Sequence, residues 1–124
     1  MRKYPSALPK KRKIEFKHIW IEWLEVNVYW IQCSREQWVK KLHDYFGVSW
    51  NHDDSECGNF STYRKNGTNV GVIWFTNKEQ SLAHECFHAV CWILAQRDIE
   101  FNQATEEVYA YMLQYLIKNI NGSG

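Results

Sequence analysis

The sequence predicts an α+β domain in which helices pack against one antiparallel or mixed sheet. Stretches of alternating apolar residues indicate strands, and two capping-box signatures ahead of apolar runs indicate helices. The predicted order is strand, strand, helix, strand, strand, helix, helix. Because the strands come in adjacent pairs, this order favours hairpins over β-α-β alternation, and therefore the α+β class.

The first three elements occupy residues 13–47. Aromatic and β-branched residues alternate with other residues over 13–23 and 26–33, which predicts two strands with a short connection. The capping-box signature Ser34-Arg35-Glu36-Gln37 predicts the start of a helix. Gly47 predicts its end, because glycine readily adopts the left-handed conformation that terminates helices.

A second hairpin and two helices follow. Residues 60–64 and 68–75 are predicted strands, joined by a turn at Lys65-Asn66-Gly67. A capping box, either Thr76 with Glu79 or Asn77 with Gln80, precedes a predicted helix over 81–95. The last helix starts near its N-cap, Thr105 or Asn102, and its apolar positions recur at helical spacing to the end of the chain.

The size and composition of the chain fit one domain. Its 124 residues are 45% hydrophobic and 16% aromatic, enough to bury a single core. We expect a basic arm (1–13), a domain (14–120) and a flexible tail (121–124). Over residues 1–41 Lys and Arg outnumber Asp and Glu by 10 to 4, and over 42–124 acids outnumber bases by 10 to 5. The arm therefore offers nucleic acid as a partner, although such arms are more often simply solvated.

The N-terminus has no apolar segment of signal-peptide or membrane-span character, so neither is expected. The four cysteines share no Cys-x-x-Cys spacing, and two lie in the apolar helix over 81–95. These features predict reduced thiols in a cytoplasmic protein without a membrane partner.

The most informative motif is His84-Glu85-Cys86-Phe87-His88, which has the His-Glu-x-x-His order of zinc hydrolases. Residues four apart on a helix lie one turn above one another, so both imidazoles can reach one ion. Glu85 beside them can take a proton from water that the ion polarises and pass it to a leaving group. From composition, roughly 0.02 accidental matches are expected in a chain of this length.

The surroundings of the motif predict that its histidines are buried. The helix over 81–95 is apolar almost all round, as in a helix enclosed by a small domain. An unpaired buried imidazole costs about 1 to 3 kcal/mol, so each ring needs a partner, and a metal ion would be one. The alternative is that each ring bonds a backbone carbonyl.

A second motif follows after 18 intervening residues, Glu107-x-x-Ala110. Together the two motifs resemble the gluzincin pattern, His-Glu-x-x-His then Glu-x-x-Ala/Ser, of thermolysin-like peptidases, ImmA/IrrE-like proteins and small phage or prophage metallopeptidase-like proteins. The resemblance covers roughly residues 70–120. It implies a zincin-like fold, one zinc ion, and Glu107 as third ligand beside His84 and His88, with Glu106 as runner-up.

The resemblance has further implications. Where the family often has an Asp that orients a ligand His, this chain has Tyr111, and loss of such a partner typically costs 10 to 100-fold in affinity or activity. The edge of the strand over 68–75 would hold an extended peptide substrate by strand addition, unless that strand is purely structural. Tyrosines often stabilise the intermediate in zincins, but no such role is assigned here to Tyr63, Tyr109 or Tyr111.

A loop between the first helix and the second hairpin holds a further group of metal-capable side chains. These side chains could shape the rim of the site, with His52 at the developing oxyanion, although an acidic turn explains them equally well. A fourth ligand from this loop, such as Cys57 or His52, would favour a structural zinc site. The group comprises His52, Asp53, Asp54, Glu56 and Cys57.

These patterns lead to one hypothesis and two rivals. The hypothesis is a zinc-dependent peptidase acting on a peptide or protein: His84, His88 and Glu107 bind the ion, and Glu85 is the general base. One rival is a metal-stabilised binding protein without catalysis, for instance a phage or mobile-element effector. The other is a nucleic-acid-binding protein that uses its basic arm.

Overall fold

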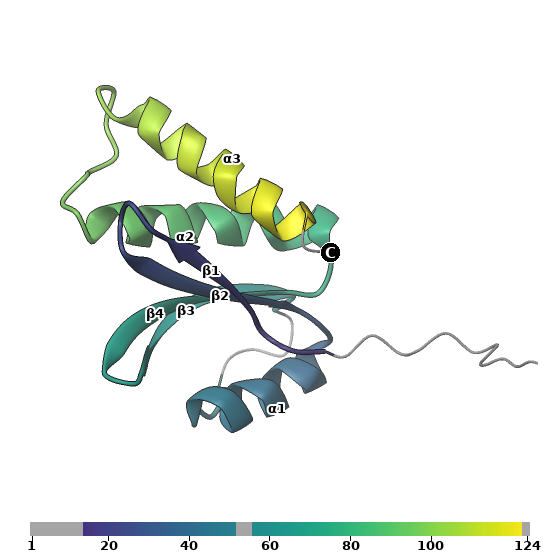
Figure 1. Cartoon of the computed structure of the whole chain (residues 1–124). Coiled ribbons are helices and arrows are strands. Elements are labelled where there is room, and N and C mark those ends of the chain that lie inside the picture. Colours follow the sequence, from purple (N-terminus) through teal and green to yellow (C-terminus); the bar gives the residue numbers. More distant parts are fainter. Residues whose placement is uncertain (1–13, 52–55, 123–124) are drawn as a thin grey trace, which may run out of the picture.

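The computed structural model describes residues 14–51 and 56–122, and it confirms the α+β class and the predicted order of elements. A four-stranded sheet is flanked by three helices (Figure 1). The elements are β1 (Lys17–Ile21), β2 (Val26–Gln32), α1 (Arg35–Phe46), β3 (Gly58–Lys65), β4 (Thr68–Phe75), the single π-helical turn η1 (Lys78–Leu82), α2 (Ala83–Ala95) and α3 (Glu106–Gly122).

The sheet is mixed, with the strand order β1-β2-β4-β3. The two hairpins, β1–β2 and β3–β4, are antiparallel, and they join through a parallel pairing of β2 with β4. The prediction that the strand over 68–75 offers an edge to a peptide is therefore wrong, since β4 is paired on both sides. Its run of buried residues from Val70 to Phe75 is typical of an interior strand.

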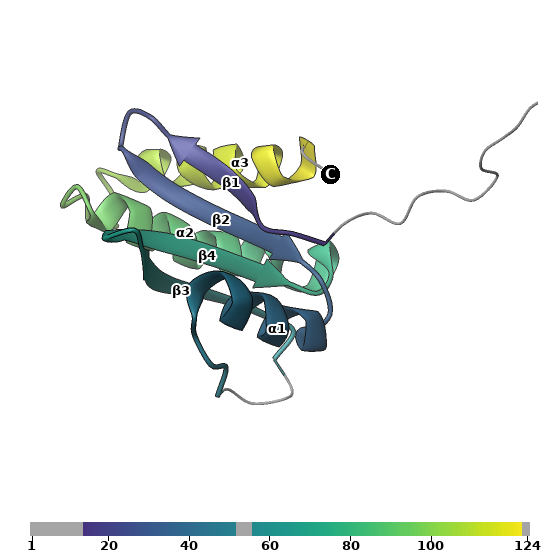
Figure 2. The same ribbon diagram turned by 60° about the horizontal axis from the view of Figure 1, so that its bottom comes forward.

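The helices lie on both faces of the sheet, α1 on one and α2 with α3 on the other (Figures 1 and 2). Alternation along β4 supplies both cores: Val72 and Trp74 pack in the cluster beneath α1, and Ile73 and Phe75 pack beneath α2. On the α1 side the rings of Trp38 and Trp74 stack, with centroids 5.3 Å apart. The His-Glu-x-x-His motif is part of α2.

The predicted turns and caps are confirmed where they depend on local sequence. Ser34 and Gln37 form the full capping box at the start of α1, and Gly47 ends it with a φ of 71°. Asn66 and Gly67 both have positive φ, 52° and 80°, as a two-residue type I′ hairpin requires.

The motif helix begins differently from the prediction. Asn77 is the N-cap, and its side chain accepts from the backbone N–H of Gln80. A π-helical turn, η1, follows, so that α2 starts at Ala83 and not at residue 81. Isolated π turns are rare in helices and often occur at functional sites.

The last helix extends to Gly122, two residues into the segment predicted as a tail. At its start the side chain of Asn102 accepts from the N–H groups of Ala104 and Thr105. The basic arm and the last two residues lie outside the described part of the chain.

The helices and the cysteines bear on the predictions made from composition. Within 14–51 and 56–122, no helix has both the length and the apolar character needed to cross a membrane. The four cysteines are unpaired in the structure: Cys33 and Cys86 are buried, Cys91 is half-buried and Cys57 is exposed.

Candidate metal centre

Two imidazoles converge on the exposed face of α2. His84 and His88 are one turn apart, and their Nε2 atoms lie 3.2 Å from each other, with the ring planes at 78°. Together with a carboxylate oxygen of Glu85, their nitrogens form a group of metal-capable atoms that all lie within 4.8 Å of one another. In the structure the rings of His84 and His88 form a hydrogen bond with each other.

The geometry of this group fits a zinc ion. Two zinc–nitrogen bonds of 2.0–2.1 Å at the tetrahedral angle would place the two nitrogens about 3.3 Å apart. The observed 3.2 Å separation of the Nε2 atoms is close to that value. Two nitrogens and a nearby carboxylate are also donors that zinc accepts readily.

The predicted burial of the histidines is wrong, because both side chains are exposed. The apolar character of α2 has a different explanation. Its inner residues contact the sheet and α3, while Phe87 on the outer face is 38% exposed. The exposure matters chemically, because a solvent-open ion can take water as a ligand, whereas structural zinc sites are closed by four protein ligands.

Glu85 is the buried member of the group, 7% exposed. Burial raises the pKa of its carboxyl group, and the charge of Glu56 raises it further. The neighbouring His84 and His88 and a hydrogen bond from the backbone N–H of Phe60 act in the opposite direction. Burial is the largest of these effects on the pKa of the Glu85 carboxyl, and the imidazoles and the Phe60 N–H offset it only in part.

The hydrogen bond from Phe60 follows from the pairing of β3. Cys57 accepts from the N–H of Thr76, so the 57–76 pair is of the hydrogen-bonded kind. In an antiparallel ladder the alternate pairs are not hydrogen-bonded, so the N–H of Phe60, three residues on, points outward from the sheet edge. The N–H of Phe60 is free of the sheet because β3 is an edge strand, and Glu85 accepts its hydrogen bond. In a central strand this N–H would be paired with a neighbouring strand.

A tight contact fixes the spacing between β3 and α2 at this point. Gly71 lies on the inner face of β4, and a Cβ atom there would come within 2.9 Å of both the Phe60 and Trp92 rings. These rings lie against each other with centroids 5.9 Å apart. The absence of a side chain at Gly71 therefore allows Phe60, and with it the donor to Glu85, to approach α2.

The predicted third ligand lies on the neighbouring helix. Glu107 and its runner-up Glu106 are in the first turn of α3, and both line a pocket together with Phe87 of α2. Neither belongs to the group formed by the two imidazoles and Glu85. Coordination by Glu107 therefore stays a prediction.

The predicted loop cluster is only partly described. His52, Asp53 and Asp54 lie outside the described residues, while Glu56 is near enough to Glu85 to affect its pKa. The carbonyl of Cys57 accepts from the Ser81 hydroxyl. Among the described residues, no member of this cluster joins the group around the imidazoles.

Tyr63, Tyr109 and Tyr111 lie in three different environments. Tyr63 packs under α1, on the opposite face of the sheet, and its oxygen accepts from the Ser61 hydroxyl. The Tyr109 hydroxyl donates to the carbonyl of Ile99 and so braces the connection before α3. Tyr111 is 67% exposed on α3.

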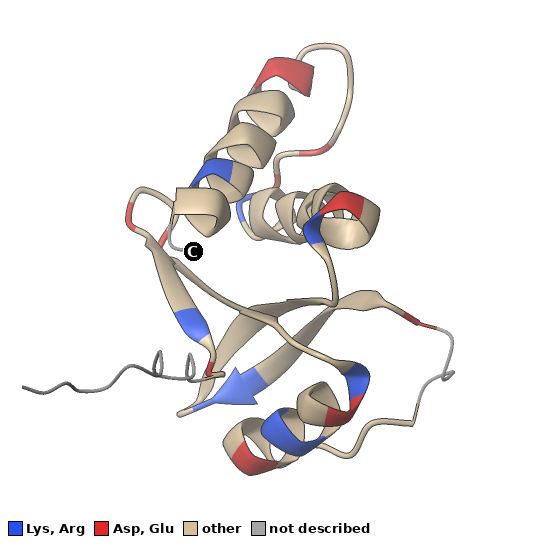
Figure 3. Cartoon of the chain, turned by 90° about the vertical axis from the view of Figure 1, so that its right-hand side faces the viewer, with Lys and Arg blue, Asp and Glu red and all other residues tan. Residues whose placement is uncertain are grey.

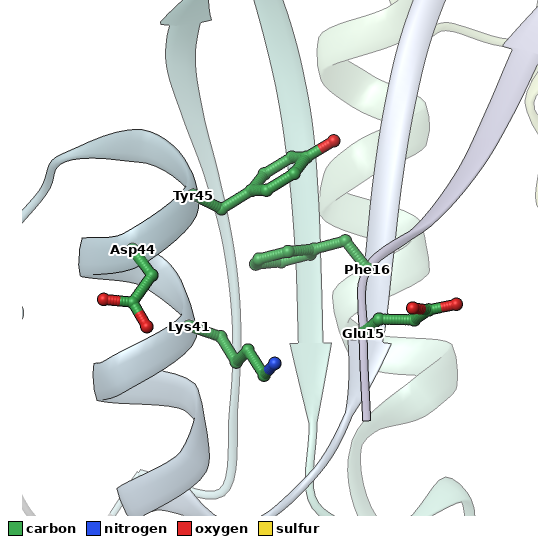
Figure 4. Close-up of a pocket in the computed structure, with 5 residues that line it drawn as sticks. All are labelled: Glu15, Phe16, Lys41, Asp44 and Tyr45. Carbon is green, nitrogen blue, oxygen red and sulfur yellow. The ribbon is translucent and has the colours of Figure 1, made fainter. Parts of the chain in front are cut away.

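A separate pocket of about 360 Å³ lies between α1 and the segment before β1 (Figure 4). Its walls include the rings of Phe16 and Tyr45, whose centroids are 5.1 Å apart. Since α1 covers the other face of the sheet, this pocket is separate from the metal-capable group.

Comparison of the chain with known protein families, with curated proteins and with solved structures finds no match. The geometry of the residues is therefore the basis for any functional assignment.

Proposed function

We propose that the protein is a zinc-dependent hydrolase, acting as a peptidase, with its ion on the exposed face of α2. The observation on which this depends is the convergence of His84 and His88 to 3.2 Å, with the Glu85 carboxylate in the same group. His84 and His88 would hold the ion and Glu107 would complete the protein ligands. Bound there, zinc would polarise a carbonyl and lower the pKa of water to about 7.

Glu85 has the environment that a general base needs. Its carboxyl is desolvated, which raises its pKa toward the working pH, and it lies beside both imidazoles. The N–H of Phe60 would hold the carboxylate in place while it accepts a proton and passes it to the leaving amine. Peptides are the proposed substrate class by the resemblance of the motif pair.

One observation favours a second function. The hydrogen bond from the Phe60 N–H to Glu85 also joins β3 to α2. Such a structural role for Glu85 is expected if the protein is a binding protein whose metal only stabilises the fold. The exposure of both imidazoles favours the hydrolase, because a structural site would be closed.

Elemental analysis and a peptide-cleavage assay test the proposal together. We expect about one equivalent of zinc in the wild type and in Glu85→Gln, and loss of zinc from His88→Ala and Glu107→Ala. Glu85→Gln should reduce turnover about 10² to 10⁴-fold, because the amide retains the hydrogen bond from Phe60 but cannot accept a proton.

The matched control is Glu79→Gln, an exposed carboxylate on η1. It should retain both zinc and turnover. Absence of zinc from the wild type would refute the metal site, and equal turnover by Glu85→Gln would remove the general-base role of Glu85. Zinc binding by the wild type without turnover would favour the binding protein.

A further inference from the structure

An open pocket of about 300 Å³ lies between α2 and α3, and Phe87 of the motif helix is in its wall. Phe87, in its wall, is three residues after His84 and directly before His88. Cβ atoms three residues apart on a helix are about 5 to 6 Å apart. A peptide whose scissile bond lay over the imidazoles would therefore have a side chain within reach of this pocket. Its lining residues are Phe87, Phe101, Glu106, Glu107, Tyr109, Ala110 and Leu113.

Two exposed aromatic rings form the apolar wall. Phe87 and Phe101 meet edge to face at 6.1 Å, and they are 38% and 57% exposed. Phe101 in turn packs against Tyr109 at 4.8 Å. Exposed rings grouped in this way are apolar surface that a ligand could bury, at about 25 cal/mol per Å².

The apolar wall of the pocket is preformed, because hydrogen bonds hold the residues that support it. The hydroxyl of Tyr109, which supports Phe101, donates to the Ile99 carbonyl over 2.7 Å. The connection that holds Phe101 is braced at its end, where Asn102 accepts from the Thr105 N–H and its own N–H donates to Thr105 Oγ1. A preformed pocket binds more tightly because little ordering remains to be done.

The size of the pocket limits what can enter. A volume of about 300 Å³ is at the small end of the range for ligand sites, so it suits one large side chain better than a multi-ring ligand.

The rim of the pocket is acidic. Residues 98–107 contain four carboxylates and no Lys or Arg. Two of these carboxylates, on Glu106 and Glu107, line the pocket itself. Figure 3 shows the acidic positions at the start of α3 and along the connection before it. A cationic side chain next to the apolar one would complement this rim.

We propose that this pocket receives a large apolar side chain, Leu or Phe, from a peptide substrate, and that Glu106 at its rim selects Lys or Arg at an adjacent position. The proposal rests on the proposed function for the placement of the peptide over the imidazoles. With Glu107 assigned to the ion, Glu106 is the carboxylate available at the rim.

The experiment uses zinc-loaded Glu85→Gln, which should bind without cleaving. Affinities are measured by fluorescence anisotropy for short labelled peptides that differ only in Leu or Ala at one position and in Lys or Glu beside it. The Leu-Lys peptide should bind at least about tenfold more tightly than the Ala-Lys peptide. Adding Phe101→Ala should bring the Leu over Ala preference close to one, and Glu106→Gln should reduce the Lys over Glu preference alone.

Two controls separate the pocket from the fold. Tyr115→Ala removes another exposed ring of α3 that lines a different pocket, and both preferences should survive it. Phe101→Leu keeps an apolar wall and should retain part of the Leu preference. Zinc content, measured for each variant, reports whether the metal group is intact.

Each result has one meaning. Unchanged preferences in Phe101→Ala, or no binding of any peptide to the zinc-loaded variant, would overturn the pocket assignment. Selective binding without cleavage by the wild type would support the pocket and refute the hydrolase. Cleavage by the wild type with no Leu preference would support the hydrolase and refute the pocket assignment.

Discussion

Cys33 shows how a buried titratable side chain couples stability to pH. Its thiol packs in the cluster beneath α1, while its backbone N–H donates to Phe75 and its carbonyl accepts from the Trp74 indole. Burial raises the pKa of the thiol from 9.0 to about 11, and Lys41 lowers it only in part. Replacement by Ala would remove the thiol and leave both backbone bonds.

This raised pKa predicts a loss of stability in alkali. Between pH 9 and about 11 the unfolded thiol releases its proton while the folded thiol keeps it, so rising pH favours unfolding. We expect the free energy of unfolding to fall in the wild type relative to Cys33→Ala by up to about 1.4 kcal/mol per pH unit over this window. Urea unfolding at a series of pH values measures it.

The control for this prediction is Val70→Ala, in the same cluster but without a titratable group. Its difference from the wild type should stay constant with pH. A parallel response of Cys33→Ala and Val70→Ala would assign the alkaline loss to other groups.

For single residues, the sequence could predict which side chains lie close together but not whether they are buried or exposed. The His84–His88 spacing places the two imidazoles on one face of any helix, and in the structure their Nε2 atoms lie 3.2 Å apart. Their exposure depends on what covers α2, which no local pattern specifies. The donor to Glu85 is a backbone N–H of Phe60, and backbone donors leave no mark in a sequence.

Among the elements, the contact between β3 and α2 at Gly71 can be tested directly. A Cβ atom in Gly71→Ala would press against the Phe60 and Trp92 rings, so overpacking should cost about 1 to 3 kcal/mol of unfolding free energy. Because Phe60 would shift away from α2, we also expect turnover to decrease. Chemical denaturation and the cleavage assay measure the two effects.

A second substitution distinguishes this explanation from a general defect. Phe60→Leu removes ring atoms from the contact, so the double variant Gly71→Ala/Phe60→Leu should be more stable than the two single effects predict. Strict additivity of the two changes would show that the close approach is not the cause.

The elements that were predicted correctly are those set by short-range chemistry. The Ser34 capping box, the Gly47 stop and the Asn66-Gly67 turn each depend on a few adjacent residues. The position of β4 inside the sheet depends on its pairing with β2, some forty residues earlier in the chain, and so was not predictable from its own pattern. The π turn η1 likewise has no distinctive local signal.

For the whole molecule, the proposed ion adds to stability by mass action. A ligand that binds only the folded state at a hundred times its Kd stabilises it by about 2.7 kcal/mol. We therefore expect a chelator to lower the Tm of the purified protein and zinc to restore it, as measured by calorimetry.

The double variant His84→Ala/His88→Ala supplies the comparison. Both side chains are exposed, so the variant should fold, and its Tm should not respond to chelator or zinc. An equal response in this variant would place the zinc elsewhere.

The interior position of β4 also has a consequence for biosynthesis. Translation delivers β1, β2, α1 and β3 before β4, yet β4 is the strand that bridges the two hairpins. Until it emerges from the ribosome, the apolar side chains of the β1–β2 hairpin on the α2 and α3 side have neither their sheet partner nor their covering helices. We therefore expect the nascent chain to expose apolar surface until late in its synthesis, and a chain truncated upstream of β4 to aggregate and not to form a smaller domain.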